Sequence, residues 1–319
     1  MRAVKHHATL TSFLCLILIF STLLPETFFT GRNFFNISQQ MSMLMVTASA
    51  MTIVMAMGDY DLSVGSMASL IGIVAAVTFK ATGSEILSFI VAVSTGLLGG
   101  SFNGVLISRL NILPFVATLG SLTIFSGLAF LIAGGKTLFG NEIPPHFVGF
   151  ARGGIPLINA ESLTLTIPNL TLIAVMVLFL VWFLLQKTVF GRHLYAIGGN
   201  AEAARLAGID VKRARLSAFM LSGFGASLAG LLYMSRVASA NPTQGSGLML
   251  DAIAAVFIGM TMNPEGEPKV LNTIVGVFFL GILSNGLTQL NIDSYIRDIL
   301  VGSLIIIAVS ASRLEKLSR

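Results

Sequence analysis

The sequence predicts an all-α, polytopic membrane protein with about ten transmembrane helices. Two of the observations that support this fold class are compositional: 55% of the 319 residues are hydrophobic and 10% are charged, and the mean hydropathy is +0.88. Soluble domains are about a quarter charged, so a water-soluble chain of this size would have to expose a very large apolar area. The third observation is that the apolar residues form runs of about 20 residues, the length at which a helix crosses a bilayer.

The first apolar run follows Arg2 and Lys5, a pattern that is also typical of a secretory signal peptide. Cleavage would need small residues at the end of the run, but the chain continues as Thr22-Leu23-Leu24-Pro25-Glu26, so we expect a retained helix. Further apolar runs follow along the whole chain; the second and third are separated only by residues 58–62, and the eighth is short. The predicted spans are 9–29, 40–57, 63–79, 85–108, 113–133, 164–186, 216–235, 248–262, 270–290 and 296–312.

The distribution of Lys and Arg predicts the orientation of these spans. With the N-terminus inside and ten alternating spans, 13 of the 19 basic residues fall on the inner side, and cytoplasmic loops carry such an excess. We therefore expect cytoplasmic termini, a cytoplasmic loop at residues 187–215 and an outward, periplasmic loop at residues 134–163. Gly134-Gly135 and Pro144-Pro145 predict that the outward loop is irregular.

Two stretches of the chain resemble each other, five predicted spans apart. Because five is odd, the two copies would cross the membrane in opposite directions and predict two inverted five-helix halves, a common plan in transporters. Short matches between frequent residues also arise by chance, so the repeat is a hypothesis. The matched residues are Asn103-Gly104, Leu110-Asn111-Ile112 and Gly120-Ser121-Leu122 in the first copy, and Asn285-Gly286, Leu290-Asn291-Ile292 and Gly302-Ser303-Leu304 in the second.

The sequence contains no pattern that is typical of catalysis or of a bound cofactor. Gly135-Lys136-Thr137 resembles the end of a phosphate-binding loop, but Phe130 stands where that loop needs a glycine. Cys15 is the single cysteine, the four histidines show no ligand spacing, and no HExxH or GxSxG pattern occurs. We therefore expect no enzyme activity, no metal and no cofactor in this chain, and we assign its basic character to cytoplasmic loops rather than to nucleic-acid binding.

A polar, basic insert at residues 191–215 interrupts the apolar chain. Residues 201–209 are good helix formers, and a short helix lying parallel to the membrane would present a small knob to a soluble partner. Binding to anionic lipid headgroups explains the cluster of Lys212, Arg213 and Arg215 as well. From the residues alone, a protein partner and a lipid surface both stay open.

Several stretches together resemble a known family over nearly the whole chain. They are Asp61–Ser66, Pro114–Gly120, Phe190–Arg192, Tyr195–Asn200, Ala203–Ile209 and Leu250–Ala255. These stretches are similar to the membrane-spanning permeases of bacterial ABC importers for simple sugars of the ribose, xylose and galactose type. Importers of autoinducer-2 share the pattern. The resemblance implies ATP-driven uptake of a monosaccharide or sugar-like molecule through the inner membrane, with ATP-Mg bound by a separate subunit.

The resemblance also implies the partners of the chain. They are the ATPase subunits, a periplasmic substrate-binding protein, a second permease (an identical copy or a homologue) and membrane lipid. A coupling helix would dock into the ATPase, and a bulky residue at Ala204 or Gly208 would block that docking. The implied coupling residues are Ala201, Glu202, Ala203, Ala204, Arg205, Leu206, Ala207, Gly208 and Ile209. The chain departs from the family pattern at residues 58–60, which read Gly-Asp-Tyr, and at residues 260–269, where a Gly-rich turn is usual.

Two acidic residues lie at membrane depth, where a charge costs about 2.5–3.5 kcal/mol on insertion scales. Asp61 and Asp251 each precede a helical run, so we interpret them as helix caps. They also support the alternative functions, an ion-gradient-driven secondary transporter or a channel; a purely structural membrane subunit has little support. Sugar recognition normally uses aromatic rings, amides and acids. The pathway candidates are therefore Asp61, Asn103, Phe115, Phe125, Asp251 and Asn285, together with Gln289.

Overall fold

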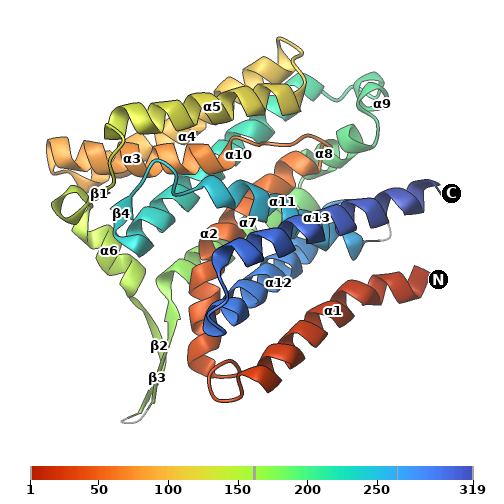
Figure 1. Ribbon diagram of the computed structural model, residues 1–319. Coiled ribbons are helices and arrows are strands. Elements are labelled where there is room, and N and C mark those ends of the chain that lie inside the picture. The colour runs from red at the N-terminus through yellow and green to blue at the C-terminus, as the bar shows by residue number, and fades with distance from the viewer. Residues whose placement is uncertain (1, 161–162, 264, 318–319) are drawn as a thin grey trace.

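A computed structural model describes residues 2–160, 163–263 and 265–317 of the chain. Within this part, α9 (Ala201–Leu206) projects at one corner of a helical body, and the hairpin of β2 (Gly154–Ala160) and β3 (Leu163–Pro168) projects at the opposite corner (Figure 1). The elements are α1 (Arg2–Leu23), α2 (Gly31–Met55), α3 (Val64–Thr82), α4 (Glu85–Ser108), α5 (Pro114–Ala133), β1 (Leu138–Phe139), η1 (Gly140–Glu142), α6 (Pro145–Arg152), β2 (Gly154–Ala160), β3 (Leu163–Pro168), α7 (Asn169–Lys187), α8 (Val189–Gly199), α9 (Ala201–Leu206), α10 (Val211–Val237), β4 (Ser239–Ala240), α11 (Ser246–Thr261), α12 (Val270–Gln289) and α13 (Ser294–Leu317).

Seven helices of the described chain are long and apolar enough to cross a membrane: α2, α3, α4, α5, α7, α10 and α12. Two shorter apolar helices, Leu10–Leu23 within α1 and all of α11, coincide with predicted spans. The prediction of an all-helical, polytopic membrane protein is therefore confirmed. The number of ten transmembrane helices stays a prediction.

The structure corrects two of the predicted helix starts. α2 begins at Gly31 instead of residue 40, because the Thr30 side chain accepts a hydrogen bond from the Asn33 backbone N–H at 3.1 Å and caps the helix there. α7 begins at Asn169 instead of residue 164, because β3 pairs with β2 in an antiparallel hairpin. Hydrophobicity misses the polar start of α2, whereas at α7 it extends the predicted span into the apolar strand β3.

The prediction of an irregular loop at residues 134–163 is wrong for the residues that the structure describes; residues 161 and 162 lie outside them. The segment contains β1, η1, α6 and β2. β1 pairs with β4, Glu142 forms an ion pair with Lys80 at the end of α3, and Glu85 at the start of α4 accepts from the His146 backbone N–H at 3.0 Å. These contacts hold the segment against the ends of the helices.

The centre of the fold is the pair α2 and α10. α10 packs against α2, α3 and α4, while α2 packs against α10, α11 and α12. Contact between α4 and α10 depends on glycine: a Cβ atom at Gly96 would lie 2.4 Å from the carbonyl oxygen of Gly223, and one at Gly223 would lie 2.1 Å from that of Gly96. Small residues allow such close approach of helices in lipid.

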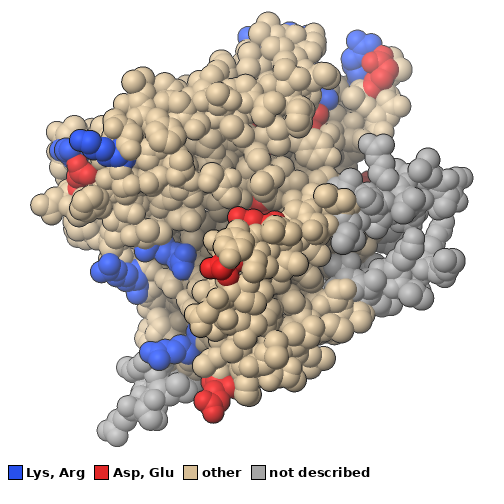
Figure 2. Space-filling view, in the orientation of Figure 1, with Lys and Arg blue, Asp and Glu red and all other residues tan. Residues whose placement is uncertain are grey.

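Large apolar side chains point outward from α4, α5, α7 and α13. Figure 2 shows a face that is mostly uncharged, with charged side chains gathered at the α9 corner and along the opposite edges, and a few acidic ones near its centre. An apolar, outward-facing surface of this extent is expected where the protein contacts lipid or another membrane subunit.

Equivalent turns recur 180 residues apart. Asp61 Oδ1 accepts from the backbone N–H and the hydroxyl of Ser63, at 3.0 and 2.6 Å. Asn241 Oδ1 accepts from the same two groups of Thr243, at 2.9 and 2.8 Å. The backbones at Gly65 and Gly245, two residues further on in each case, touch each other so closely that a Cβ on either would lie within 2.4 Å of the other's carbonyl oxygen.

A second pair of turns follows the same spacing. Asn111 after α4 and Asn291 after α12 both adopt the left-handed conformation, each with φ of 55°. Asparagine is among the few residues that tolerate this conformation at the end of a helix. The two turns belong to the Leu-Asn-Ile matches found in the sequence.

Candidate functional site

The polar insert between α7 and α10 folds into two short helices, α8 and α9. The predicted helix at residues 201–209 is present as α9, which ends at Leu206. Asn200 caps it by accepting from the backbone N–H groups of Glu202 and Ala203, both at 3.0 Å. Gly208 then turns the chain with φ of +87°, a conformation in which glycine is favoured.

α9 presents a small apolar knob at the corner of the molecule (Figure 1). Ala204 faces inward and is buried, whereas the Leu206 side chain is 80% exposed at the end of the helix. Glu202 and Arg205 form an exposed ion pair beside it at 2.6 Å. A large apolar side chain held outward on a capped, rigid turn, with charges around it, has the form of a contact point for another protein.

α8 holds this knob against two corners of the bundle. A Cβ atom at Gly198 would lie 2.3 Å from the carbonyl oxygen of Ala56, at the end of α2. The Tyr195 hydroxyl donates to the carbonyl oxygen of Pro268 at 2.7 Å, in the loop between α11 and α12. Burial and then the negative charge of Glu267 raise the pKa of Tyr195 to about 12, so this donor stays protonated at physiological pH. The unusual loop at residues 260–269 thus contacts α8 through Pro268.

An ion pair joins the insert to the α2–α3 loop (residues 56–63). Arg215 in the first turns of α10 lies 3.0 Å from Asp59, measured from Nε to Oδ2, and the Asp59 side chain is only 7% exposed. The other carboxylate oxygen of Asp59, Oδ1, accepts a hydrogen bond from Arg215 Nη2 at 3.3 Å. Asp59 is one of the departures from the family pattern, and the pair gives it a structural partner.

The same loop continues into a buried chain of hydrogen bonds. Asp61 Oδ2 accepts from Ser222 on α10 at 2.7 Å. The Ser63 hydroxyl accepts from Asn103 on α4 at 2.8 Å, and Asn103 in turn accepts from Ser121 on α5 at 2.5 Å. All five side chains are buried. Buried polar groups satisfied in this way fix the relative positions of the elements that carry them.

The interpretation of the two acids as helix caps needs correction. Asp61 does accept a backbone N–H, from Ser63, but Ser63 itself occupies the N-cap position of α3. The interpretation is wrong for Asp251, which lies inside α11 because that helix begins at Ser246. Asp251 instead pairs with Arg297 on α13.

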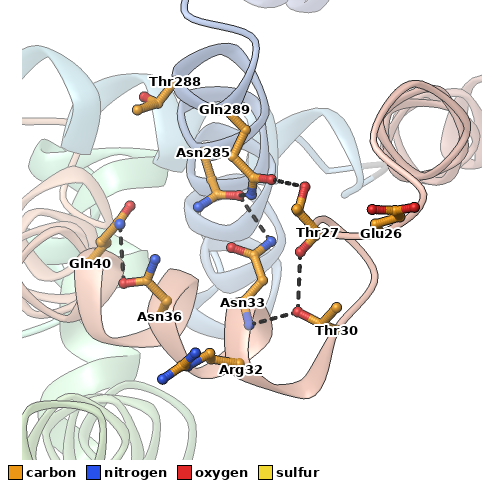
Figure 3. A pocket seen from close by; sticks show the side chains of 10 residues that line it. All are labelled: Glu26, Thr27, Thr30, Arg32, Asn33, Asn36, Gln40, Asn285, Thr288 and Gln289. Carbon is orange, nitrogen blue, oxygen red and sulfur yellow. Dashed lines mark hydrogen bonds between the residues drawn. The ribbon is translucent and has the colours of Figure 1, made fainter.

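A cavity of about 710 Å³ lies at the α1–α2 turn, which is at the end of the molecule away from α9 (Figure 1). Its walls come from the α1–α2 turn, the start of α2 and the end of α12 (Figure 3). Asn285 Oδ1 accepts from Asn33 at 3.1 Å and from Gln289 at 2.7 Å. Thr27 donates to Gln289 at 2.7 Å, so the wall is a connected row of amides and hydroxyls.

The other pathway candidates do not line this cavity. Asp61, Asn103 and Phe125 are buried, while Phe115 is 57% exposed on α5. Sequence reasoning missed Asn33, Asn36 and Gln40, although their spacing of three and four marks one face of a helix. In the described residues, no group of three or more His, Cys, Asp or Glu side chains is arranged to hold a metal ion.

The sequence of this chain is similar to those of known transport proteins. The model of the family described as "Branched-chain amino acid transport system / permease component" matches residues 33–309. The ribose import permease protein RbsC of Escherichia coli (strain K12) is 36% identical over 302 residues, which cover 94% of this chain and 91% of that protein. The D-allose transport system permease protein AlsC and the xylose transport system permease protein XylH of the same strain are 32% and 29% identical. Each match covers 94% of this chain and 89% of the relative.

Proposed function

This chain belongs to the family of branched-chain amino acid transport system permease components, and from this premise we infer that it is the permease subunit of an ATP-driven importer. A permease of this kind is a transport subunit and not a catalytic one. We propose that its cargo is a monosaccharide or a sugar-like molecule, because the similar proteins are named for ribose, D-allose and xylose. ATP and Mg²⁺ would bind to a separate ATPase subunit.

The observation that carries the proposed coupling is the exposed apolar knob on α9. We place residues 187–215 in the cytoplasm, where Ala201–Ile209 would dock on the ATPase. Both termini would lie on the same side, and residues 134–163 would face the periplasm, where a substrate-binding protein delivers cargo. The chain would sit in a bacterial inner membrane beside a second permease copy or homologue.

The equivalent turns at Asp61 and Asn241 support two inverted halves. Their hydrogen bonds match at an offset of 180 residues, and so does the left-handed conformation of Asn111 and Asn291. The packing supports the same arrangement, because α10 contacts α3 and α4 whereas α2 contacts α11 and α12. Two halves related in this way would let access alternate between the two sides of the membrane.

A relay from the knob to the bundle would run through the α2–α3 loop. α8 touches this loop at Ala56, Arg215 holds it at Asp59, and Asp61 ties it to α10. A shift of α8 and α9 against the ATPase would therefore move the junction of α2, α3 and α10. The contact of Tyr195 with Pro268 would carry the same shift to the α11–α12 loop.

Breaking this relay is expected to uncouple transport from ATP hydrolysis. We expect Asp59→Arg and Arg215→Asp each to reduce uptake at least tenfold, because each leaves two like charges facing each other at a mostly buried site. The combined variant Asp59→Arg/Arg215→Asp restores the pair with its charges exchanged, and we expect it to recover part of the uptake. Uptake and ATP hydrolysis are measured together in vesicles, with co-purification of the ATPase as the check on assembly. A combined variant as inactive as the worse single variant would contradict the relay.

The function itself is tested by reconstitution. The chain is inserted into vesicles with the proposed ATPase and binding protein, and uptake of D-ribose, D-allose and D-xylose is followed. We expect uptake of at least one sugar that requires ATP and all three components. Uptake by the chain alone under a proton gradient would instead establish the ion-driven alternative.

A further inference from the structure

The cavity at the α1–α2 turn is lined by polar residues. The ten side chains that line it comprise five amides, three threonine hydroxyls, one carboxylate and one guanidinium. None of these ten side chains is apolar, although 55% of the whole chain is hydrophobic. The cavity volume of about 710 Å³ falls in the range of about 300–1,000 Å³ that is typical of small-molecule sites.

We propose that this cavity is a receiving site for a neutral, polyhydroxylated molecule such as a monosaccharide, on the side of the chain away from the α9 knob. Each hydroxyl of a sugar both donates and accepts hydrogen bonds, and amides and threonine hydroxyls do the same. The two charged side chains, Glu26 and Arg32, have opposite signs and leave the site without net charge. This inference rests on the proposed function and adds a site at which the transported molecule binds.

The lining also discriminates between the cargo classes suggested by the comparisons. The pocket of a branched-chain amino acid surrounds its side chain with aliphatic or aromatic residues, and none of the ten lining residues is of these types. The named sugars of the similar proteins have no such requirement. We therefore assign the cavity to sugars and expect a branched-chain amino acid such as L-leucine not to compete.

Some side chains in the cavity wall are held by hydrogen bonds within the protein, and others keep donors and acceptors available for a ligand. Asn33 and Asn285 are buried and hold each other, with a further bond from Asn33 to the Phe28 carbonyl oxygen at 2.9 Å. Asn36 is exposed and Gln40 half-buried, and the only side-chain hydrogen bond of either residue within the described chain joins the two at 3.3 Å. A ligand can therefore use the remaining donors and acceptors of Asn36 and Gln40 without dismantling the buried pair.

A cysteine introduced at Asn36 tests the proposal in the assembled importer. Cys15, the single native cysteine, is first replaced by serine, and the chain is reconstituted with its ATPase and binding protein in right-side-out vesicles. A charged methanethiosulfonate reagent is applied from outside. We expect modification of the Asn36→Cys variant to reduce uptake at least tenfold, and saturating D-ribose, D-allose or D-xylose to slow the modification at least threefold. L-leucine should give no protection.

The control is Ala81→Cys near the end of α3, which is exposed and lies outside both the cavity lining and residues 134–163. We expect this variant to be modified without loss of uptake and without protection by any sugar. A second, milder variant, Asn36→Ala/Gln40→Ala, should reduce uptake at limiting sugar about three- to tenfold, the range of one or two lost neutral hydrogen bonds.

The outcomes separate this proposal from the proposed function. If the ATPase co-purifies and drives uptake, but modification at residue 36 neither blocks uptake nor is slowed by any of the three sugars, the cavity is not a cargo site. If the unmodified chain neither binds an ATPase nor supports ATP-driven uptake, the importer function fails instead. Protection by L-leucine would overturn the assignment to sugars.

Discussion

Replacing Leu206 with Asp is expected to release the chain from the proposed ATPase subunit and to abolish ATP-driven uptake. The Leu206 side chain is 80% exposed at the end of α9 and makes little contact with the rest of the chain, so its removal should not disturb the fold. A central apolar anchor of an interface is worth about 2 kcal/mol or more, and a carboxylate in its place adds a desolvation cost. We therefore expect the affinity for the ATPase to fall at least about thirtyfold.

Leu206→Met is the matched control, because methionine is apolar and of similar volume. We expect this variant to keep both co-purification of the ATPase and uptake. The measurement is co-purification in detergent, where a helix that only binds lipid headgroups would show no difference between Asp and Met. An Asp variant that is still recovered with the ATPase and transports normally would refute docking through α9.

Ala204 and Gly208, the positions that the sequence alone suggests for this test, are poorer choices. Ala204 is buried on the inner side of α9, so a bulky side chain there would displace the helix instead of blocking its contact with a partner. Gly208 has φ of +87°, and any other residue would be strained there. A loss of docking in either variant would not be distinguishable from local unfolding. Exposure of Leu206, which only the structure reveals, gives the cleaner experiment.

Local sequence signals predict α9 and the apolar helices, but not the contacts that connect them. The helix at 201–209 can be predicted because its helix formers and its cap, Asn200, are neighbours in the chain. Asp59 and Arg215 are 156 residues apart, and nothing near either residue announces the other. The cavity is missed for another reason: the start of α2 is polar, so a search for apolar runs excludes Asn33 and Asn36 from the helix.

The proposed inverted repeat shows the same limit at a larger scale. The Leu-Asn-Ile matches are visible in the sequence, and the structure gives both asparagines the same left-handed backbone. The pair of turns at Asp61 and Asn241 is hidden, because Asp-Leu-Ser and Asn-Pro-Thr share no residue. They share hydrogen-bonding capacity: a side-chain oxygen that accepts from a hydroxyl residue two positions later. The two turns therefore form the same hydrogen bonds with different residues.

Gly223→Ala is expected to destabilise the fold strongly, although it adds only one methyl group. The new Cβ atom would lie 2.1 Å from the Gly96 carbonyl oxygen and 3.0 Å from the Gly100 backbone. Both are backbone atoms within α4, which cannot rotate away as a side chain can. Overpacking of a core usually costs about 1–3 kcal/mol, and we expect at least the upper end because the clash lies between two helix backbones.

Gly127→Ala on α5 is the control, because nothing lies within 4 Å of a Cβ atom built there. Alanine is about 0.5–1 kcal/mol better than glycine inside a helix, so this variant should be as stable as the parent or slightly more stable. Stability is measured as the fraction of monodisperse protein that remains after heating in detergent. Equal stability of the two variants would mean that α4 and α10 are not in contact as described. The relay from Arg215 through Ser222 into the bundle would then lose its physical basis, because both residues lie on the helix that this contact positions.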